Sequence, residues 1–255
     1  TDHTPGFGSA AKYVASTVRE ITLDANVYEK KSVTIIEIMG RHAGWLTAAS
    51  ALARKYDGDN PLFIYLPETD FDQEAFLKDL EKAFETNCNL IVCVSEGIHD
   101  AEGTFICEYD SSVGIDTFGH KMLAGCGKYL ENLVRSRLGV KARSVELNVS
   151  QRCSAAMISA TDQQEAVAAG KFGVQAALNG ETGKMVSFIR EADADGNYQM
   201  ICGLEDVNEF AEKSITLPLF AETLHAATKK TYAAAEFPHT AHIDFSFCFQ
   251  LGSCY

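Results

Sequence analysis

Short apolar runs alternate with longer amphipathic segments over the first part of the chain. The runs at 33–38, 62–66 and 90–94 are rich in Val, Ile and Leu and have the length of buried strands. Between them, 46–54 is rich in Ala and Leu, and 72–86 carries a stripe of Phe and Leu at helical spacing. This alternation predicts an α/β fold, a parallel Rossmann-like sheet with helices on both faces.

The same alternation continues downstream. The further predicted elements are a helix at 121–138, a strand at 143–147, an exit loop at 148–155, a helix capped by Thr161 and Asp162 and running to 179, and paired strands at 184–190 and 198–202. Residues 208–255 show no consistent period, so they receive no structural assignment.

The turn after the first strand is the most informative stretch. Met39, Gly40 and Arg41 follow this strand directly, and ligands of open α/β sheets bind outside the carboxyl ends of the strands. Gly40 would let a substrate approach the backbone, and Arg41 carries a planar charged fork that suits phosphate. An isolated loop arginine can equally pair with a surface carboxylate. The turn alone leaves both interpretations open.

Two more strand ends carry polar groups. Glu96 follows the third strand and Arg152 lies in the loop after the fourth, so both are expected at the same sheet edge as Arg41. Arg143 begins the fourth strand and should lie at the opposite edge. Glu96 could instead cap a helix, and Arg152 could form a loop ion pair. Convergence of two arginines and a carboxylate favours a phosphorylated sugar as ligand.

Composition narrows the possible partners. The 255 residues carry a formal net charge of -13 without a Lys/Arg block, so nucleic acid and membrane are not expected as partners. No apolar run is long enough to span a bilayer, and residues 1–20 do not form a secretory signal. The eight cysteines form no CxxC pair, which predicts reduced, mostly buried thiols of a cytoplasmic protein.

Several apparent motifs do not carry chemistry. The stretch 180–185 lacks the spacing and the Ser/Thr of a phosphate-binding loop, and 193–196 is too short for a calcium loop. His239 and His242 have no third ligand nearby, so no metal-ligating residue is assigned. No glycine-rich loop for a phosphoryl donor is found either.

Four motifs resemble the successive signatures of the 6-phosphofructokinase family. They are Thr1–Ala11 (TDHTPGFGSAA), Ile36–Trp45 (IEIMGRHAGW), Val94–Gly97 (VSEG) and Arg143–Arg152 (RSVELNVSQR). The resemblance covers about residues 1–207. It is closest to the branch that includes pyrophosphate-dependent enzymes.

The resemblance implies a phosphotransferase of glycolysis. It would transfer a phosphoryl group from pyrophosphate or ATP to the 1-hydroxyl of fructose 6-phosphate, with Mg²⁺ as cofactor. Met39, Gly40 and Arg41 would hold the sugar, Arg41 would also contact the transferring phosphoryl group, and Glu96 and Arg152 would complete the site. Arg143 would reach the 6-phosphate of a neighbouring subunit, which implies a homo-oligomer.

The chain departs from the family pattern at several points. Ser32 replaces an arginine of the phosphate site, with Lys30 and Lys31 adjacent, and Val149 replaces a histidine. The donor loops and the Thr-x-Asp-x-Asp motif would lie upstream of Thr1, so this chain is expected to be a fragment that is inactive alone.

By the same resemblance, 5–150 would be the acceptor domain, 151–207 a returning segment of the donor domain, and 208–255 a divergent tail. An ATP-dependent enzyme and a non-catalytic regulatory subunit that binds sugar phosphate remain alternatives.

Overall fold

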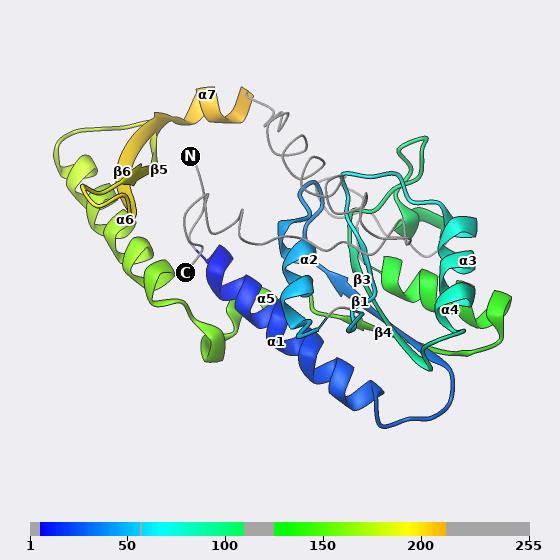
Figure 1. Cartoon of the computed structure of the whole chain (residues 1–255). Coiled ribbons are helices and arrows are strands. Elements are labelled where there is room, and N and C mark those ends of the chain that lie inside the picture. The colour runs from blue at the N-terminus through cyan, green and yellow to red at the C-terminus, as the bar shows by residue number, and fades with distance from the viewer. Residues whose placement is uncertain (1–5, 57, 110–124, 213–255) are drawn as a thin grey trace. The chain divides into compact units, whose positions relative to one another are not determined.

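A computed structural model describes residues 6–56, 58–109 and 125–212 of the chain (Figure 1). These residues form two compact units. One comprises 11–153, and the other comprises 154–212 together with 6–10. The tail from 213 onward lies outside the described residues.

The first unit is built on a four-stranded parallel sheet. Its strands are β1 (Ser32–Ile38), β2 (Phe63–Tyr65), β3 (Asn89–Ser95) and β4 (Lys141–Glu146), in the order β2-β3-β1-β4. Every strand predicted from an apolar run is present, so the predicted α/β fold with a parallel sheet is confirmed.

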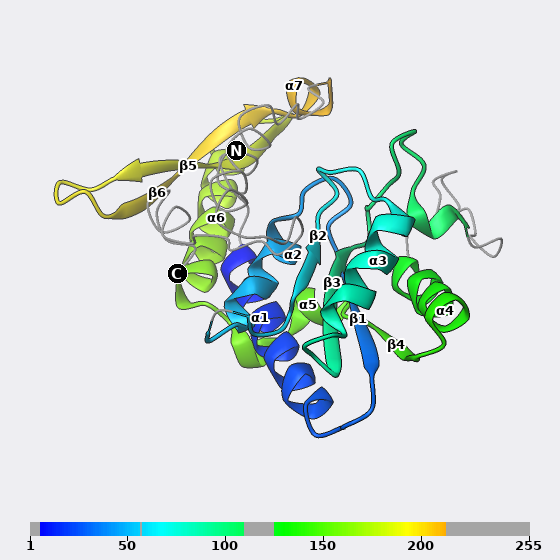
Figure 2. The ribbon, with the colours of Figure 1, turned by 45° about the vertical axis from the view of Figure 1, so that its right-hand side comes forward.

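Helices cover both faces of this sheet. They are α1 (Phe7–Ala25), α2 (Trp45–Ala49), α3 (Gln73–Ala83) and α4 (Cys126–Leu138). In both views α1 and α2 lie on one face, and α3 and α4 lie on the other (Figures 1 and 2). Phe76 and Leu80 of α3 and Leu130 of α4 are buried against the sheet. A buried side chain of this size contributes about 1.5–3 kcal/mol to stability.

Two predicted stretches differ in the structure. The helix predicted over 46–54 is α-helical only to Ala49 and continues as a 3-10 turn, Ser50–Ala53. The Ser50 hydroxyl donates to the Thr47 carbonyl at 2.6 Å, a local bond that competes with regular helix pairing. The exit loop predicted at 148–155 contains a short helix, α5 (Ser150–Cys153), and a 3-10 turn, Ala155–Met157, begins at its end.

A buried carboxylate ties the sheet to α4. Glu37 of β1 is only 5% exposed, and its Oε1 and Oε2 accept the N–H groups of Gly125 and Gly127 at 3.2 and 2.7 Å. These donors lie at the start of α4, where the helix dipole favours negative charge. Burial raises the pKa of Glu37, and the two N–H groups partly offset this shift.

The second unit contains α6 (Ala160–Leu178), a hairpin of β5 (Lys184–Ala192) and β6 (Tyr198–Asp206), and α7 (Val207–Glu212). The hairpin confirms the predicted strand pair. The α6 cap was assigned wrongly, because Ser159 accepts the Asp162 N–H and so precedes the predicted cap by two residues.

The structure also describes most of the cysteines and the hydrophobicity of the helices. Six cysteines are free thiols, and Cys93, Cys107 and Cys126 among them are buried. Cys248 and Cys254 lie outside the described residues. Within the described ranges, no helix is both long enough and apolar enough to cross a bilayer.

Candidate functional site

The turn that follows β1 is bonded to the end of β3. The Gly40 N–H donates to Oε1 of Glu96 at 3.2 Å, and the Ser95 hydroxyl donates to the Gly40 carbonyl at 2.6 Å. In addition, the Glu96 N–H donates to the Ile38 carbonyl at 3.0 Å, which continues the pairing of the two strands. The structure therefore places Gly40 and Glu96 in direct contact at the carboxyl edge of the sheet.

Two glycines allow this turn to close. A Cβ at Gly97 would lie 1.9 Å from the Arg41 carbonyl oxygen, far inside contact distance. A Cβ at Gly40 would lie 2.7 Å from the Ala43 carbonyl oxygen. Gly40 is therefore required by the shape of the turn, whether or not a substrate approaches it. Gly97 holds the backbone of Arg41 close to the end of β3.

Glu96 lies within the electrostatic reach of Arg41 and Arg152. It is half-buried, and burial raises its pKa above the ordinary value for glutamate. The Gly40 N–H and the charges of Arg41 and Arg152 partly offset this shift. Both guanidinium groups therefore act electrostatically on the same carboxylate, and both side chains are exposed to solvent. This edge of the sheet can receive an anion that also carries hydroxyl groups.

Glu68 also holds the turn after β1, and it was not identified in the sequence analysis. It follows β2, and its Oε1 accepts the Gly44 N–H at 2.6 Å, so it holds the far end of the turn that carries Arg41. Burial raises the pKa of this carboxyl as well. The rule that located Glu96, a polar group just after a buried strand, would also have found Glu68.

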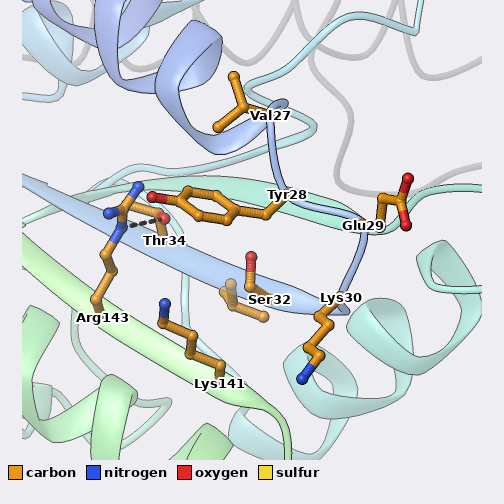
Figure 3. A pocket seen from close by; sticks show the side chains of 9 residues that line it. Val27, Tyr28, Glu29, Lys30, Ser32, Thr34, Lys141 and Arg143 are labelled. Atoms are coloured by element: carbon orange, nitrogen blue, oxygen red, sulfur yellow. Dashed lines mark hydrogen bonds between the residues drawn. The ribbon is translucent and has the colours of Figure 1, made fainter.

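Arg143 lies at the other edge of the sheet, in a cavity of 330 Å³ at the start of β1 and β4 (Figure 3). Its Nε donates to the Thr34 hydroxyl at 3.0 Å, and its terminal nitrogen pairs with Asp24 at 2.8 Å. These bonds orient the guanidinium group. Within this chain, the structure does not bring Arg143 together with Arg41, Glu96 and Arg152.

Other cations line the same cavity. Lys30 and Lys141 lie near Ser32 in this cavity (Figure 3). The Lys141 ammonium lies 5.3 Å from the ring centre of Tyr28. Lys31 is directed elsewhere, with its ammonium 5.3 Å from the ring centre of Phe84. The cavity thus combines Arg143 with two lysines, a set that suits a phosphate group.

The described residues do not fit a metal ion held by this chain alone. Among the described ranges, no group of three His, Cys, Asp or Glu side chains could hold one. The Asp193 carboxylate instead accepts the N–H groups of Asp195 and Asn197 in the hairpin turn.

The fold and the site together define a class of protein. The chain is an α/β protein with a parallel sheet, and Gly40 and Glu96 are bonded to each other at the carboxyl edge of its strands, where ligands of such sheets bind. A family profile described as phosphofructokinase matches residues 1–177. The chain belongs to the phosphofructokinase family.

Curated relatives agree with this assignment. The chain is 41% identical over 203 residues to a pyrophosphate--fructose 6-phosphate 1-phosphotransferase of Xanthomonas campestris, covering 79% of this chain and 48% of that protein. It is also 34% identical over 188 residues to ATP-dependent 6-phosphofructokinase 2 of Streptomyces coelicolor, covering 73% and 52% of the two chains. The chain therefore spans about half the length of the curated relatives it matches.

A solved structure is similar as well. The pyrophosphate-dependent phosphofructokinase of Marinobacter aquaeolei superposes with a TM-score of 0.65 at 32% identity. The match covers 84% of this chain and 49% of that one. It supports the parallel α/β architecture independently of the motifs.

Proposed function

We propose that this chain forms the fructose 6-phosphate-binding part of a phosphofructokinase that uses pyrophosphate as phosphoryl donor. The observation that carries the proposal is the position of Glu96. It bonds to the Gly40 N–H and lies within the electrostatic reach of Arg41 and Arg152, in a chain of this family. The carboxylate can accept hydrogen bonds from sugar hydroxyls, and the two arginines can pair with a phosphate group at the same edge of the sheet.

In the proposed reaction the 1-hydroxyl oxygen of the sugar forms a bond to phosphorus. The bridging P–O bond of pyrophosphate breaks, phosphate leaves, and the hydroxyl proton passes to a base. Met39 and Gly40 position the sugar, Glu96 accepts from its hydroxyl groups, and Arg152 supports the same site. The Arg41 fork stabilises the charge that is spread over the transferring group in the transition state.

The donor and the cofactor belong to the proposal too. Mg²⁺, which the family resemblance implies, would neutralise charge on the donor phosphates when bound. ATP is the second candidate donor, because the Streptomyces relative is named as ATP-dependent. We place the reaction in the cytoplasm, in a homo-oligomer in which Arg143 reaches the sugar phosphate held by a neighbouring subunit.

The direct test separates binding from transfer. The chain is incubated with fructose 6-phosphate and Mg²⁺, with pyrophosphate and ATP in separate reactions, and fructose 1,6-bisphosphate is measured. Calorimetry measures sugar phosphate binding in parallel. Where the gene encodes a longer product, that product is assayed in the same way.

The outcomes separate the hypotheses. Transfer from pyrophosphate supports the proposal, and transfer only from ATP selects the second donor. Binding without transfer in any form favours a regulatory subunit. Absence of both binding and transfer contradicts the proposed function.

Glu96→Gln should weaken fructose 6-phosphate binding about tenfold at neutral pH, because hydrogen bonds to a charged acceptor are about twice as strong as neutral ones. Glutamine keeps an oxygen for the Gly40 N–H, so the turn should remain intact. Burial raises the Glu96 pKa, so the native affinity should fall as the pH falls through that raised value. Calorimetry at several pH values measures both effects.

In the Glu96→Gln chain, the affinity for fructose 6-phosphate should no longer fall through protonation of residue 96. Its stability should be unchanged or higher, because ionising a buried carboxyl with a raised pKa costs free energy in the folded state. Equal affinities for both proteins across the pH series would contradict the role given to Glu96.

Arg143→Ala should weaken apparent affinity for fructose 6-phosphate about tenfold or more, with a smaller effect on turnover. The lost contact would be a charge-assisted bond to the 6-phosphate, which binds the ground state and the transition state alike. Steady-state kinetics of the active oligomer measure KM and kcat separately. Arg137→Ala is the matched control, because this exposed arginine pairs with Glu74 at 2.8 Å and lies outside the cavity. An unaltered KM in Arg143→Ala would argue against the shared site.

A further inference from the structure

A buried amide side chain joins the two arginine-bearing segments at the carboxyl edge of the sheet. Gln151, in α5, is only 3% exposed and directly precedes Arg152. Its Oε1 accepts the Met39 N–H at 3.0 Å, and its Nε2 donates to the Met39 carbonyl at 3.2 Å. One primary amide thus satisfies both main-chain groups of Met39, as a neighbouring strand would.

These two bonds continue the β1–β4 pairing past its end. The last main-chain bond between these segments joins the Leu147 N–H to the Glu37 carbonyl at 3.0 Å. Beyond it the chain turns into α5, and the Gln151 side chain takes over the pairing with Met39. The turn is thereby held on both sides, by Glu96 at Gly40 and by Gln151 at Met39.

We propose that Gln151 is a positioning residue of the acceptor site, whose amide holds α5, with Arg152, in register with the turn that carries Arg41. The inference rests on the proposed function, since the two arginines matter together only if they bind one ligand. The side chains of Arg41 and Arg152 are long and exposed, so binding one anion with both costs conformational entropy. A fixed distance between their backbones lowers this cost.

We call the two hydrogen bonds between the Gln151 amide and Met39 the clamp. Gln151→Glu is the decisive variant, because it makes the clamp depend on pH. A protonated Glu has nearly the shape of Gln, and it can donate its O–H to the Met39 carbonyl while accepting the Met39 N–H. An ionised Glu has no donor and sets a negative charge against that carbonyl. Burial favours the protonated form of the introduced carboxyl and so raises its pKa. Its ionisation should therefore occur between about pH 5 and pH 8.

The measurement is the Kd for fructose 6-phosphate by calorimetry from pH 8 to pH 5, for the variant and the wild-type chain. Taking the ratio of the two Kd values at each pH cancels the titration of the ligand phosphate. We expect a ratio of about ten at pH 8 that falls to within about twofold of unity at pH 5. Gln151→Met keeps an unbranched side chain of similar length without hydrogen bonds. Its ratio should stay high at every pH.

A matched control is Gln175→Glu. Gln175 is exposed on α6, where its amide donates to Asn179 at 3.0 Å, so this variant should follow the wild type throughout. If Gln151 only stabilised the fold, its variants would melt at lower temperature yet bind with an unchanged Kd while folded. A Kd ratio for Gln151→Glu that stays near one, or that is raised equally at all pH values, would overturn the proposal.

Hydrogen exchange separates this inference from the proposed function. A wild-type chain that binds no fructose 6-phosphate would contradict the function itself. The Met39 amide would still report whether Gln151 holds this residue, with exchange in Gln151→Met, which has no acceptor for the Met39 N–H, faster than in the wild type at pH 8. Equal exchange in both proteins at pH 8 would overturn the clamp.

Discussion

Replacing Arg41 by alanine should lower the rate of phosphoryl transfer to fructose 6-phosphate by about 100-fold or more. The transferring group carries negative charge over several oxygens, and a fixed guanidinium that meets this charge stabilises the transition state more than the ground state. Removal of one such donor typically costs about 2.7–4 kcal/mol of activation free energy. The measurement is kcat in whichever form of the protein transfers the phosphoryl group.

The fold should survive this substitution. The Arg41 side chain is exposed, and the contact that constrains the residue involves its carbonyl oxygen, which alanine keeps. Unfolding curves of the variant should therefore overlay those of the wild type. Arg41→Lys retains a charge but not the planar fork, so it should recover only part of the lost rate. A kcat of Arg41→Ala equal to that of the wild type would refute the role of Arg41.

The sheet could be predicted from the sequence because each strand is a separate apolar run. Parallel strands buried on both faces need such runs, and 33–38 and 90–94 show them without interruption apart from Thr34 and Glu37. The edge that carries Arg41, Glu96 and Arg152 then follows from topology, since every parallel strand ends at that edge. The pattern of apolar runs and one rule of sheet topology were therefore sufficient to predict the sheet and this edge.

Contacts between distant segments could not be predicted in the same way. The amide of Gln151 meets Met39 across 112 positions of sequence, and no local pattern marks a glutamine for that role. Glu37 is similar, because a glutamate within an apolar run is buried only if another segment supplies donors, here Gly125 and Gly127. Such residues become visible only when the tertiary structure brings their partners together.

The predicted end of the helix over 46–54 was also wrong. The composition of 46–54 favours a continuous helix, yet the structure has α-helix only over Trp45–Ala49. The Ser50 hydroxyl donates to the Thr47 carbonyl at 2.6 Å, and the chain continues from there as a 3-10 turn. The Gly44 N–H at the start of this helix is bonded to Glu68 after β2, a tertiary contact that propensity does not report. The resemblance to the family could name Arg143 as part of a phosphate site, but it gave no account of Thr34 and Asp24, which orient its guanidinium.

Gly97→Ala should abolish most fructose 6-phosphate binding, with a loss of about 100-fold or more, and should also destabilise the chain. The added Cβ would lie 1.9 Å from the Arg41 carbonyl oxygen, and both partners belong to main chain that cannot simply swing aside. Either the end of β3 or the turn after β1 must therefore move. Insertion of a methyl group into such a packed position typically costs about 1–3 kcal/mol of folding free energy.

The binding loss should exceed what the lower stability explains. Movement of the turn would displace Gly40 from Glu96 and change where Arg41 points, so the folded variant should still bind poorly. Calorimetry under conditions in which denaturant curves show the variant to be folded measures this separately. Gly97→Ala with native affinity would show that the close approach of Gly97 to Arg41 is not needed by the site.

A second glycine in the same chain supplies the control for Gly97→Ala. Gly170 lies within α6, and a Cβ placed there would have no neighbour within 4 Å. Gly170→Ala should therefore stabilise the chain by about 0.5–1 kcal/mol through helix propensity and leave sugar phosphate binding unchanged. Any general effect of replacing glycine by alanine is common to both variants. If only Gly97→Ala loses stability and binding, the loss comes from the contact of the added methyl group with Arg41.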